Sequence, residues 1–554
     1  MLREIDMDAA KIDLPIDKLK YWAKNYPERQ VLFQPIDGKL HTYTWQQILE
    51  QATAVASKLV SLGYEPGDKI ALLSKNVAEW FIADFAIMMG GFVSIPIYPT
   101  ANAETIAYVL EHAECKAIFI GKLDDFGPQE AGINTNVKRI DMGYPTMQTE
   151  VSWSDCIACE SEFAEPVVTP DDVMTILYTS GSTGMPKGAL HSYRSFVNTG
   201  LHLGMRVGTT PEDRSLSYLP LAHCTERAYV ESTFLSYGAQ IYFVESLDTF
   251  NRDLVRCSPT VFGSVPRLWT LFQKGVLQKM PQKKLDLLLK IPLISSLIKK
   301  KIKAGLGFSD ARIFLSGSAP ISEKILEWYQ KLGINIGEAW GMTETFAAGT
   351  TPRMDKPAKF GTISLPTEGV DLRIADDGEI VMKTDSNMLG YYKDDAKTEE
   401  ALVDGFVQTG DLGELDSEGY VKITGRKKDI FKTEKGKYVA PVPIEKLFAE
   451  NEYIEQMCLM GTTLKQPVLI VNLSQSGKSQ DRGLLTESLE TTLAHVNQSL
   501  EKHETVSHII VAGSDWTAES GELTPTLKVK RHVIEKVFLS QAQSCEGEGK
   551  IRFD

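Results

Sequence analysis

The stretch from Ile176 to Leu190, ILYTSGSTGMPKGAL, decides how this chain is interpreted. An apolar run ends abruptly in a loop of small polar residues, glycines, one proline and one lysine. Glycines let backbone N–H groups approach a phosphate closely, hydroxyls add donors, and a lysine adds positive charge. A surface turn rich in small polar residues is the ordinary alternative, but it explains this density of residue types poorly. We therefore interpret the loop as a phosphate-binding segment.

The loop lacks the Walker A pattern, which requires GxxxxGK followed by Ser or Thr. Counting from Gly181, the residue before Lys187 is Pro186, and the residue after the lysine is Gly188. A Walker-type NTPase or kinase is therefore disfavoured. The side chains and backbone groups that would meet the phosphates belong to Ser180, Gly181, Ser182, Thr183, Gly184 and Lys187.

Length and composition limit the classes of protein to which this chain can belong. A chain of 554 residues exceeds what one hydrophobic core usually organises, so we expect two or more domains. The formal net charge of -14 argues against a general nucleic-acid binder, which needs a positive field. The N-terminal stretch MLREIDMDAAKIDL mixes acids with bases, so we expect no signal peptide. We therefore expect a cytoplasmic protein, and peripheral contact with the inner face of the membrane stays an open alternative.

The most apolar stretch is WFIADFAIMMGGFVSIPIYP, residues 80–99. It contains Asp84, a glycine pair and two prolines, which suits a buried helix followed by a strand better than a membrane span. The seven cysteines are an odd number and indicate free thiols in a reducing compartment. Cys156 and Cys159 form a CxxC without a second pair, and the histidines show no HExxH, so we expect no transition-metal site.

Helical stretches such as TWQQILEQATAVASKLVSLG alternate with short β-rich runs such as KIALLS, and the alternation returns in QIYFV, PTVFGSVP, ARIFLSG and ISEKILEWYQKLG. This alternation predicts an α/β fold with parallel βαβ units in a large multi-sheet N-terminal domain. The sequence pattern then changes to short strands and turns. A small α+β domain is predicted by three later stretches, PVLIVNLSQ, LLTESLETTLAHVNQSL and VSHIIVAGS. We place the large domain at residues 1–425 and the small one at 426–554, joined at GRKKD (425–429).

Further stretches accompany the loop in a fixed order: SGSAP (316–320), GEAWGMTE (337–344), TGD (409–411), GRKKD (425–429) and GELTPTLKVKR (521–531). Together with YTSGSTGMPKG they closely resemble the adenylate-forming superfamily of acyl-CoA synthetases, peptide-synthetase adenylation domains and luciferases. The resemblance runs from about Trp22 to Phe538. Four shorter stretches look like those of the long-chain fatty acyl-CoA synthetase branch: LPLAHCTER, PTVFGSVPRLW, YVAPVPIE and LTPTLKVKR.

The resemblance implies activation of a fatty acid by ATP to an acyl-adenylate, followed by transfer to CoA. It also implies a nucleotide site made by Thr179, Ser180, Gly181, Ser182, Thr183, Gly184, Lys187, Gly317, Ser318, Ala319, Glu338, Ala339, Trp340, Gly341, Met342, Thr343, Asp411 and Arg426. Thr179 and Glu344 would hold Mg²⁺, which prefers hard oxygen ligands and phosphate. The catalytic residues implied are Lys528, His223 and Lys187.

Each of these roles has an ordinary alternative. Lys528 lies beside Lys530 and Arg531, so the segment could be a basic surface strand, and the flanking LTPT favours the catalytic role. A single His223 after an apolar run is often a packed core residue, and Trp340 would otherwise be core. The resemblance makes Lys428 the hinge about which the mobile small domain turns, so that Lys528 withdraws for thioester formation.

Two stretches depart from the family's pattern. GTISLP has Ser364 where Gly is usual, and KTEKGKYVAP lacks the usual Gly pair, which puts the thioester step in doubt. The segment Lys283 to Gly307, KKLDLLLKIPLISSLIKKKIKAGLG, combines apolar and lysine-rich faces. It is compatible with an interfacial helix on anionic lipid, but we favour a solvated helix packed on its own domain because the chain is acidic overall.

Three functions remain in competition. A fatty acyl-CoA synthetase leads, an enzyme that loads a carrier-protein phosphopantetheine follows, and an idle nucleotide- or lipid-binding paralogue is the third. The retained Lys528, Glu344 and phosphate loop argue against the idle form. The preferred chain length of the acid and the oligomeric state leave no motif in the sequence.

Overall fold

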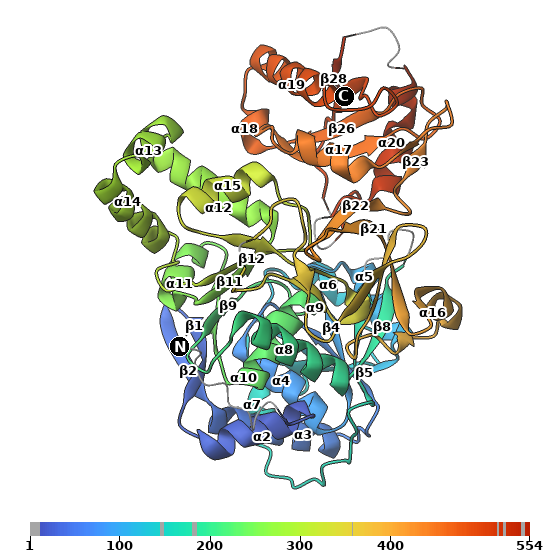
Figure 1. Cartoon of the computed structure of the whole chain (residues 1–554). Coiled ribbons are helices and arrows are strands. Elements are labelled where there is room, and N and C mark those ends of the chain that lie inside the picture. Colours follow the sequence, from blue (N-terminus) through green and yellow to red (C-terminus); the bar gives the residue numbers. More distant parts are fainter. Residues whose placement is uncertain are drawn as a thin grey trace.

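The computed structural model describes residues 11–144, 149–179, 185–356, 358–517, 520–524, 528–544 and 549–554. Figure 1 shows the first part of the chain as a large body and the last part as a smaller body above it. The fold class predicted from the sequence is confirmed, with several sheets, parallel strands and flanking helices. The boundary near residue 425 stays a prediction.

The sheet that carries the phosphate loop has seven strands in the order β19-β8-β7-β4-β3-β5-β6. Their bounds are β3 Lys69–Leu73, β4 Val93–Ile97, β5 Cys115–Ile120, β6 Lys138–Asp141, β7 Val173–Thr179, β8 Lys187–Ser192 and β19 Gly390–Tyr391. The strands from β7 through β4, β3 and β5 to β6 run parallel. Strands β3 and β4 are almost wholly buried, which is why their sequences read as unbroken apolar runs.

Helices precede and follow these strands along the chain, and amphipathic sequence predicted one of them at residues 44–63. They are α2 Pro15–Asn25, α3 Trp45–Ser61, α4 Ala78–Met89, α5 Ala103–His112, α6 Gly127–Glu130, α7 Trp153–Ile157 and α8 Tyr193–Val207. The apolar stretch at residues 80–99 forms the buried helix α4 and then strand β4, as predicted. No helix in the described part of the chain is long and apolar enough to cross a membrane.

Two further sheets lie beside the first. One has the order β2-β1-β10-β9 and the other β11-β12-β13, with bounds β1 Gln30–Ile36, β2 Lys39–Thr44, β9 Arg214–Ser217, β10 Gln240–Phe243, β11 Val261–Ser264, β12 Ile313–Ser316 and β13 Ile336–Glu338. Strands β11, β12 and β13 are parallel, so the segments that follow them leave at one edge. That edge carries SGSAP and GEAWGMTE.

The intervening helices are α9 Cys224–Glu226, the π-helix η1 Arg227–Ser232, α10 Thr233–Tyr237, α11 Phe250–Cys257, α12 Pro266–Lys279, α13 Gln282–Leu289, α14 Pro292–Gly305 and α15 Glu323–Lys331. The π-helix contains a fully buried ion-pair group, because Arg227 contacts both Asp84 and Glu231. A buried charge needs such partners to be tolerated. The segment at residues 283–307, considered as one helix from its sequence, forms the two helices α13 and α14.

Short strands then build two antiparallel sheets, β14-β15-β16 and β17-β18-β21-β20 with β22 beside β21. Their bounds are β14 Trp340–Gly341, β15 Gly349–Thr351, β16 Leu365–Pro366, β17 Asp371–Ile374, β18 Glu379–Lys383, β20 Leu402–Val403, β21 Phe406–Leu415 and β22 Val421–Arg426, with helices η2 Thr343–Thr345 and α16 Asp395–Ala401. Strands β21 and β22 lead to the upper body (Figure 1).

The C-terminal part has its own mixed sheet in the order β25-β26-β27-β28, with an antiparallel first pair and parallel later pairs. Its elements are β23 Phe431–Lys432, β24 Tyr438–Val439, α17 Pro441–Phe448, β25 Ile454–Met460, β26 Val468–Leu473, α18 Gln475–Lys478, α19 Arg482–Asn497, β27 His508–Val511, α20 Arg531–Ser544 and β28 Ile551–Phe553. Apolar side chains cover both faces of this sheet, as expected for the α+β domain predicted from the sequence.

Candidate active site

The phosphate loop joins two antiparallel strands. Thr179 ends β7 and pairs in register with Lys187, the first residue of β8. The Thr179 hydroxyl donates to the Lys187 carbonyl oxygen at 3.4 Å. A Walker loop leads instead from a strand into a helix, so this hairpin agrees with the failed motif match. The predicted phosphate ligands between these strands, Ser180, Gly181, Ser182, Thr183 and Gly184, lie outside the described residues.

Lys187 and Glu344 meet around a tyrosine that the sequence did not single out. The Tyr391 hydroxyl donates to Glu344 Oε1 at 2.6 Å, and the Lys187 ammonium lies 4.1 Å from the centre of the Tyr391 ring. Burial lowers the pKa of Lys187, and the nearby Glu344 opposes this change. Lys187 stays a cation in a partly desolvated place, where its attraction for an anion is stronger than in water.

The segments after β12 and β13 lie against each other. The Ala339 N–H donates to the Ser316 carbonyl at 2.8 Å, and a Cβ at Gly317 would come within 3.0 Å of the Ala339 carbonyl oxygen. Ser318 adopts a left-handed φ of 65°, which turns the chain directly before Ala319. Two motifs separated in sequence therefore share one edge.

Glu338 is the buried acid of this edge. Its Oε1 atom has no hydrogen-bond partner among the residues that the structure describes. Burial raises the pKa of Glu338 to about 7. A buried carboxyl oxygen without a partner is costly, so it marks a place where a ligand donor would be stabilised.

The residues that follow Trp340 turn sharply. A side chain at Gly341 would clash with the Ala347 carbonyl oxygen, since a Cβ there would lie only 2.4 Å away. The Met342 carbonyl accepts the N–H of Ala347 at 2.9 Å, and the Thr343 carbonyl lies 2.7 Å from Nε2 of the buried His191. This turn holds Glu344 toward β8.

Trp340, Asp411 and Arg426 form a second group. The Trp340 indole Nε1 donates to Asp411 Oδ2 at 3.1 Å, and Arg426 Nε lies 3.8 Å from Asp411 Oδ1. Asp411 and Arg426 are opposite each other on β21 and β22. Burial raises the pKa of Asp411, and Arg426 opposes this. Trp340 is half-buried and packs against the small apolar cluster that contains Ile380 and Met382.

Lys528 comes near this group of residues from the far end of the chain. It lies within electrostatic reach of Asp411, Cys224 and Glu344, although its backbone belongs to the C-terminal part. The surrounding protein lowers the pKa of Lys528 by desolvation and next through Arg426, while the side chain keeps access to solvent. An accessible ammonium near the Arg426 guanidinium is suited to bind an anion.

His223 lies within electrostatic reach of Lys528 and caps the N-terminus of helix α9. Its Nδ1 accepts the N–H of Thr225 at 3.2 Å, so a neutral ring carries its proton on Nε2. Burial and then Lys528 lower the pKa of His223 to about 4. The ring is half-buried. It presents an N–H donor near Lys528 at neutral pH.

Lys428 follows β22 at an exposed position within electrostatic reach of Lys187. Ion pairs connect the two bodies beyond it: Arg267 with Glu455 at 2.9 Å, Lys446 with Glu323 at 3.5 Å, and Lys324 with Glu450. Next to Lys428, Lys427 binds Glu379 at 2.9 Å. Sequence reasoning missed these pairs, as well as Tyr391 and Cys224, because no spacing along the chain indicates them.

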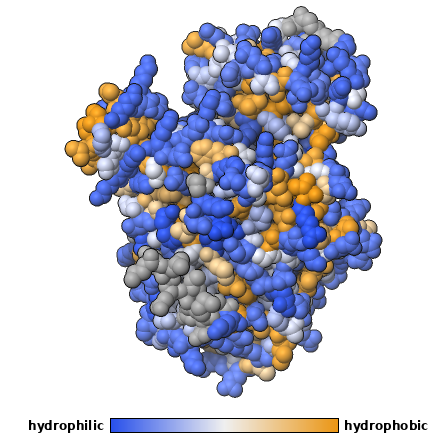
Figure 2. Space-filling view, in the orientation of Figure 1, coloured by the Kyte–Doolittle hydropathy of each residue, from blue (hydrophilic) through white to orange (hydrophobic). Residues whose placement is uncertain are grey.

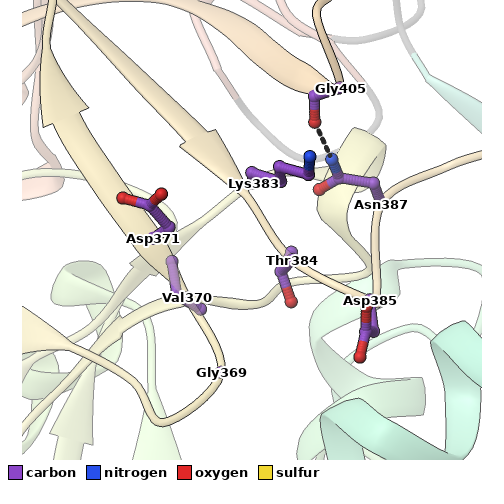
Figure 3. A pocket seen from close by; sticks show the side chains of 8 residues that line it. All are labelled: Gly369, Val370, Asp371, Lys383, Thr384, Asp385, Asn387 and Gly405. Atoms are coloured by element: carbon purple, nitrogen blue, oxygen red, sulfur yellow. Dashed lines mark hydrogen bonds between the residues drawn. The ribbon is translucent and has the colours of Figure 1, made fainter.

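An open polar hollow of about 500 Å³ lies elsewhere, beside β17 and β18 (Figure 3). Its lining residues are Gly369, Val370, Asp371, Lys383, Thr384, Asp385, Asn387 and Gly405. Asn387 Nδ2 donates to the Gly405 carbonyl at 3.0 Å across one side of it. The hollow contains none of the predicted site residues, and its mixed charges favour no ligand.

Comparison with known proteins agrees with this geometry. A family model described as AMP-binding enzyme matches residues 19–392, and one described as AMP-binding enzyme C-terminal domain matches residues 428–545. The chain belongs to the AMP-binding enzyme family. The superfamily identified from the sequence motifs is therefore confirmed.

Relatives of this AMP-binding enzyme span nearly its whole length. A long-chain-fatty-acid CoA ligase of Mycobacterium bovis is 29% identical, over 94% of each chain. Long-chain-fatty-acid CoA ligase 5 of Rattus norvegicus is 28% identical, over 91% of this chain and 84% of that one. The branch suggested by the shorter motifs is thus the branch of these relatives.

Solved structures share the fold. The adenylation domain of a carboxylate reductase from Mycobacterium chelonae superposes with a TM-score of 0.79 at 20% identity, covering 98% of this chain and 94% of that one. The o-succinylbenzoate CoA synthetase of Bacillus subtilis, solved with its acyl-adenylate, gives 0.73 at 20% identity, covering 94% of this chain and 97% of that one. At such identity the likeness concerns the architecture of this AMP-binding enzyme.

Proposed function

We propose that this AMP-binding enzyme activates a long-chain fatty acid with ATP and transfers the acyl group to CoA. The observation that carries the proposal is that Lys528 lies within electrostatic reach of His223, Asp411 and Glu344. A carboxylate that entered there would have a cation and a neutral imidazole N–H on one side and the nucleotide groups on the other. Relatives named as long-chain-fatty-acid CoA ligases over most of their length support the substrate class.

The first half-reaction joins two anions. The fatty carboxylate oxygen attacks the α-phosphorus of ATP, the bond to the bridging oxygen breaks, and pyrophosphate leaves. Lys528 would hold the carboxylate and α-phosphate together and stabilise the charge between them, which is the main task when both reactants are negative. Lys187 would hold the departing phosphates, since its ammonium is already partly desolvated.

Magnesium fits the donors present. Glu344 offers carboxylate oxygens and Thr179 a hydroxyl, which are hard ligands of the kind Mg²⁺ takes together with phosphate oxygens. Bound there, the ion would neutralise charge on the triphosphate. Tyr391 holds Glu344 Oε1, leaving Oε2 of that carboxylate for a cation.

The nucleotide would lie along the edge made by SGSAP and GEAWGMTE. The partnerless Oε1 of Glu338 would accept a hydrogen bond from the adenine amino group. Asp411, held by Trp340 and Arg426, would accept the ribose hydroxyls. Gly317, Ser318 and Ala319 would contribute backbone groups beside the adenine.

The acyl chain needs an apolar path from His223. A narrow seam of about 20 Å³ lies against the π-helix, whose Tyr229 and Val230 line it. It is lined by Leu203, Val207, Thr209, Asp213, Ser215, Tyr229, Val230, Thr233, Phe234, Ala239, Ile241, Val261 and Leu315. The seam holds little more than one water, so a fatty chain would open it by moving side chains.

The second half-reaction would follow a rotation about Lys428. The CoA sulfur attacks the acyl carbon, the bond to the AMP oxygen breaks, AMP leaves, and the thiol proton passes to solvent. Exposed ion pairs between the two bodies support a mobile arrangement, because such pairs are individually weak. Separating two reactions by moving one body is a known use of domain closure.

A CoA-dependent AMP-release assay over carboxylates from short to very long chain tests the proposal. We expect release with long-chain acids that stops when CoA is left out. Release that requires a phosphopantetheine carrier in place of CoA would replace the proposal with carrier loading. Failure to exchange pyrophosphate into ATP with any carboxylate would leave the protein an idle binding paralogue.

A further inference from the structure

Helices α13 and α14 project from the large body as a hairpin (Figure 1). The two helices are joined by only Lys290 and Ile291. Leu285 is buried, and Ile298 and Ile302 pack on the aromatic cluster around Trp269. The hairpin is therefore anchored along one side, and its other side has no described protein against it.

The free side carries large apolar residues near the connection. Leu293 is 88% exposed, Leu297 67% and Leu287 62%, and Ile291 and Ile294 are exposed as well. Figure 2 shows this projecting lobe with apolar residues gathered at its outer side and hydrophilic ones around them. Burying a leucine is favourable, so a group of exposed leucines indicates an interaction surface.

Lysines occupy the ends of the hairpin that are remote from the connection. Lys283 and Lys284 begin α13, while Lys299, Lys300, Lys301 and Lys303 lie in the second half of α14. With Lys290, the two helices contain seven lysines and a single acidic residue, Asp286. This basic patch contrasts with a chain whose net charge is -14.

We propose that the α13–α14 hairpin docks on an anionic lipid surface. The leucines would enter the boundary between headgroups and acyl chains, and the lysines would meet the phosphates of the headgroups. A second copy of the chain would fit poorly, because a shared face would set lysines against lysines. The proposal does not depend on the adenylation chemistry, since it concerns binding without substrate.

Flotation of the full-length protein with lipid vesicles tests the docking. Neutral phosphatidylcholine vesicles are compared with vesicles that contain about one third phosphatidylglycerol. We expect binding to the anionic vesicles that weakens as salt rises, because the lysine contribution is screened. The double variant Leu293→Asp/Leu297→Asp should lower the partition coefficient roughly tenfold or more. Lys300→Glu/Lys301→Glu should lower it about tenfold on anionic vesicles only.

Matched controls separate this surface from general effects. Leu484→Asp/Val537→Asp changes two exposed apolar residues of the upper body, and Lys116→Glu/Lys502→Glu makes the same charge change elsewhere. Both controls should float with the vesicles like the original protein. All variants should keep the original Tm and the rate of pyrophosphate exchange.

Three results would overturn the proposal. One is equal flotation of the hairpin variants and the controls. Another is absence of wild-type binding to anionic vesicles. The third is a concentration-dependent dimer that Leu293→Asp/Leu297→Asp dissolves while vesicle binding is unchanged, which would make the hairpin a self-association face. If the aspartate variant failed to fold, the lysine variant and the salt dependence would decide.

Discussion

The Tyr391 hydroxyl donates a hydrogen bond to Glu344 Oε1 at 2.6 Å, across a gap of 47 residues in sequence. The same ring lies under the Lys187 ammonium at 4.1 Å. One tyrosine therefore positions both the acid that would face the metal and the lysine that would face the phosphates. It acts through these two groups and is a positioning residue.

Tyr391→Phe should slow adenylation while the ring contact to Lys187 persists. A hydrogen bond to a charged group is worth about 1.5–3 kcal/mol, so we expect a loss of roughly tenfold to a hundredfold in pyrophosphate exchange. The dependence on Mg²⁺ should shift to higher concentration, a readout that a purely structural role would not move. Tyr392→Phe is the control, because that hydroxyl faces Glu114. Equal losses in both variants would refute the role.

Lys528→Ala should separate the two half-reactions. Losing a group that stabilises transition-state charge typically costs roughly a hundredfold to a thousandfold, so pyrophosphate exchange should fall by that factor. Transfer from a supplied acyl-adenylate to CoA should persist. Lys530→Ala, two residues further on, should behave like the original enzyme. If adenylation were intact in Lys528→Ala, the assignment would be wrong.

Glu338→Gln should stabilise the fold at alkaline pH. Burial raises the pKa of Glu338 from 4.5 to about 7. Between these values the unfolded chain has released the proton that the folded protein still holds, so the free energy of unfolding falls as pH rises through this window. Glu338→Gln removes this loss of free energy of unfolding, which amounts to at most about 3 kcal/mol at pH 8.

Denaturant unfolding at pH 4.5 and pH 8 measures this effect of Glu338→Gln. The variant's gain in free energy of unfolding should be present at pH 8 and small at pH 4.5. Glu327→Gln, at an exposed site on α15, should give no such difference. A gain that is the same at both pH values would show that Glu338 is already ionised in the folded protein.

Val230→Trp should shorten the acids that the enzyme accepts. Val230 lines the narrow seam along the π-helix that we propose as the acyl path, and an indole there would fill the space that a long chain must open. We expect kcat/KM to fall roughly tenfold for long-chain acids, with short-chain acids unaffected. Val255→Trp, on the exposed face of α11, is the control. Unchanged chain-length preference would exclude this seam as the acyl path.

Local pattern predicted much of the fold. Periodicity predicted helix α3, and apolar runs predicted strands β3, β4 and β12. In each of these elements the apolar residues of the pattern are the ones that are buried. The segment from Lys283 was harder, since Pro292 begins a second helix where the amphipathic pattern continues. A helix often starts at proline, and the pattern alone did not separate that start from an interior position.

The site was predictable only where residues belong to recognisable motifs. Motifs indicated Lys528, Asp411 and Glu344, but the neighbourhood of Tyr391 depends on strand β19 pairing with β8. Such pairing between distant segments leaves no local signal. The same reason explains why the ion pairs between the two bodies, such as Arg267 with Glu455, became visible only in three dimensions.

The ion pairs that join the two bodies have a consequence for the timing of the proposed rotation. Arg267 with Glu455 and Lys446 with Glu323 are formed by side chains in contact with water. Exposed pairs are worth about 0.2–1 kcal/mol each and weaken further as salt screens them. The arrangement that brings Lys528 near Asp411 would thus be a shallow minimum. Ionic strength would set how long the enzyme dwells in it before turning to the second reaction.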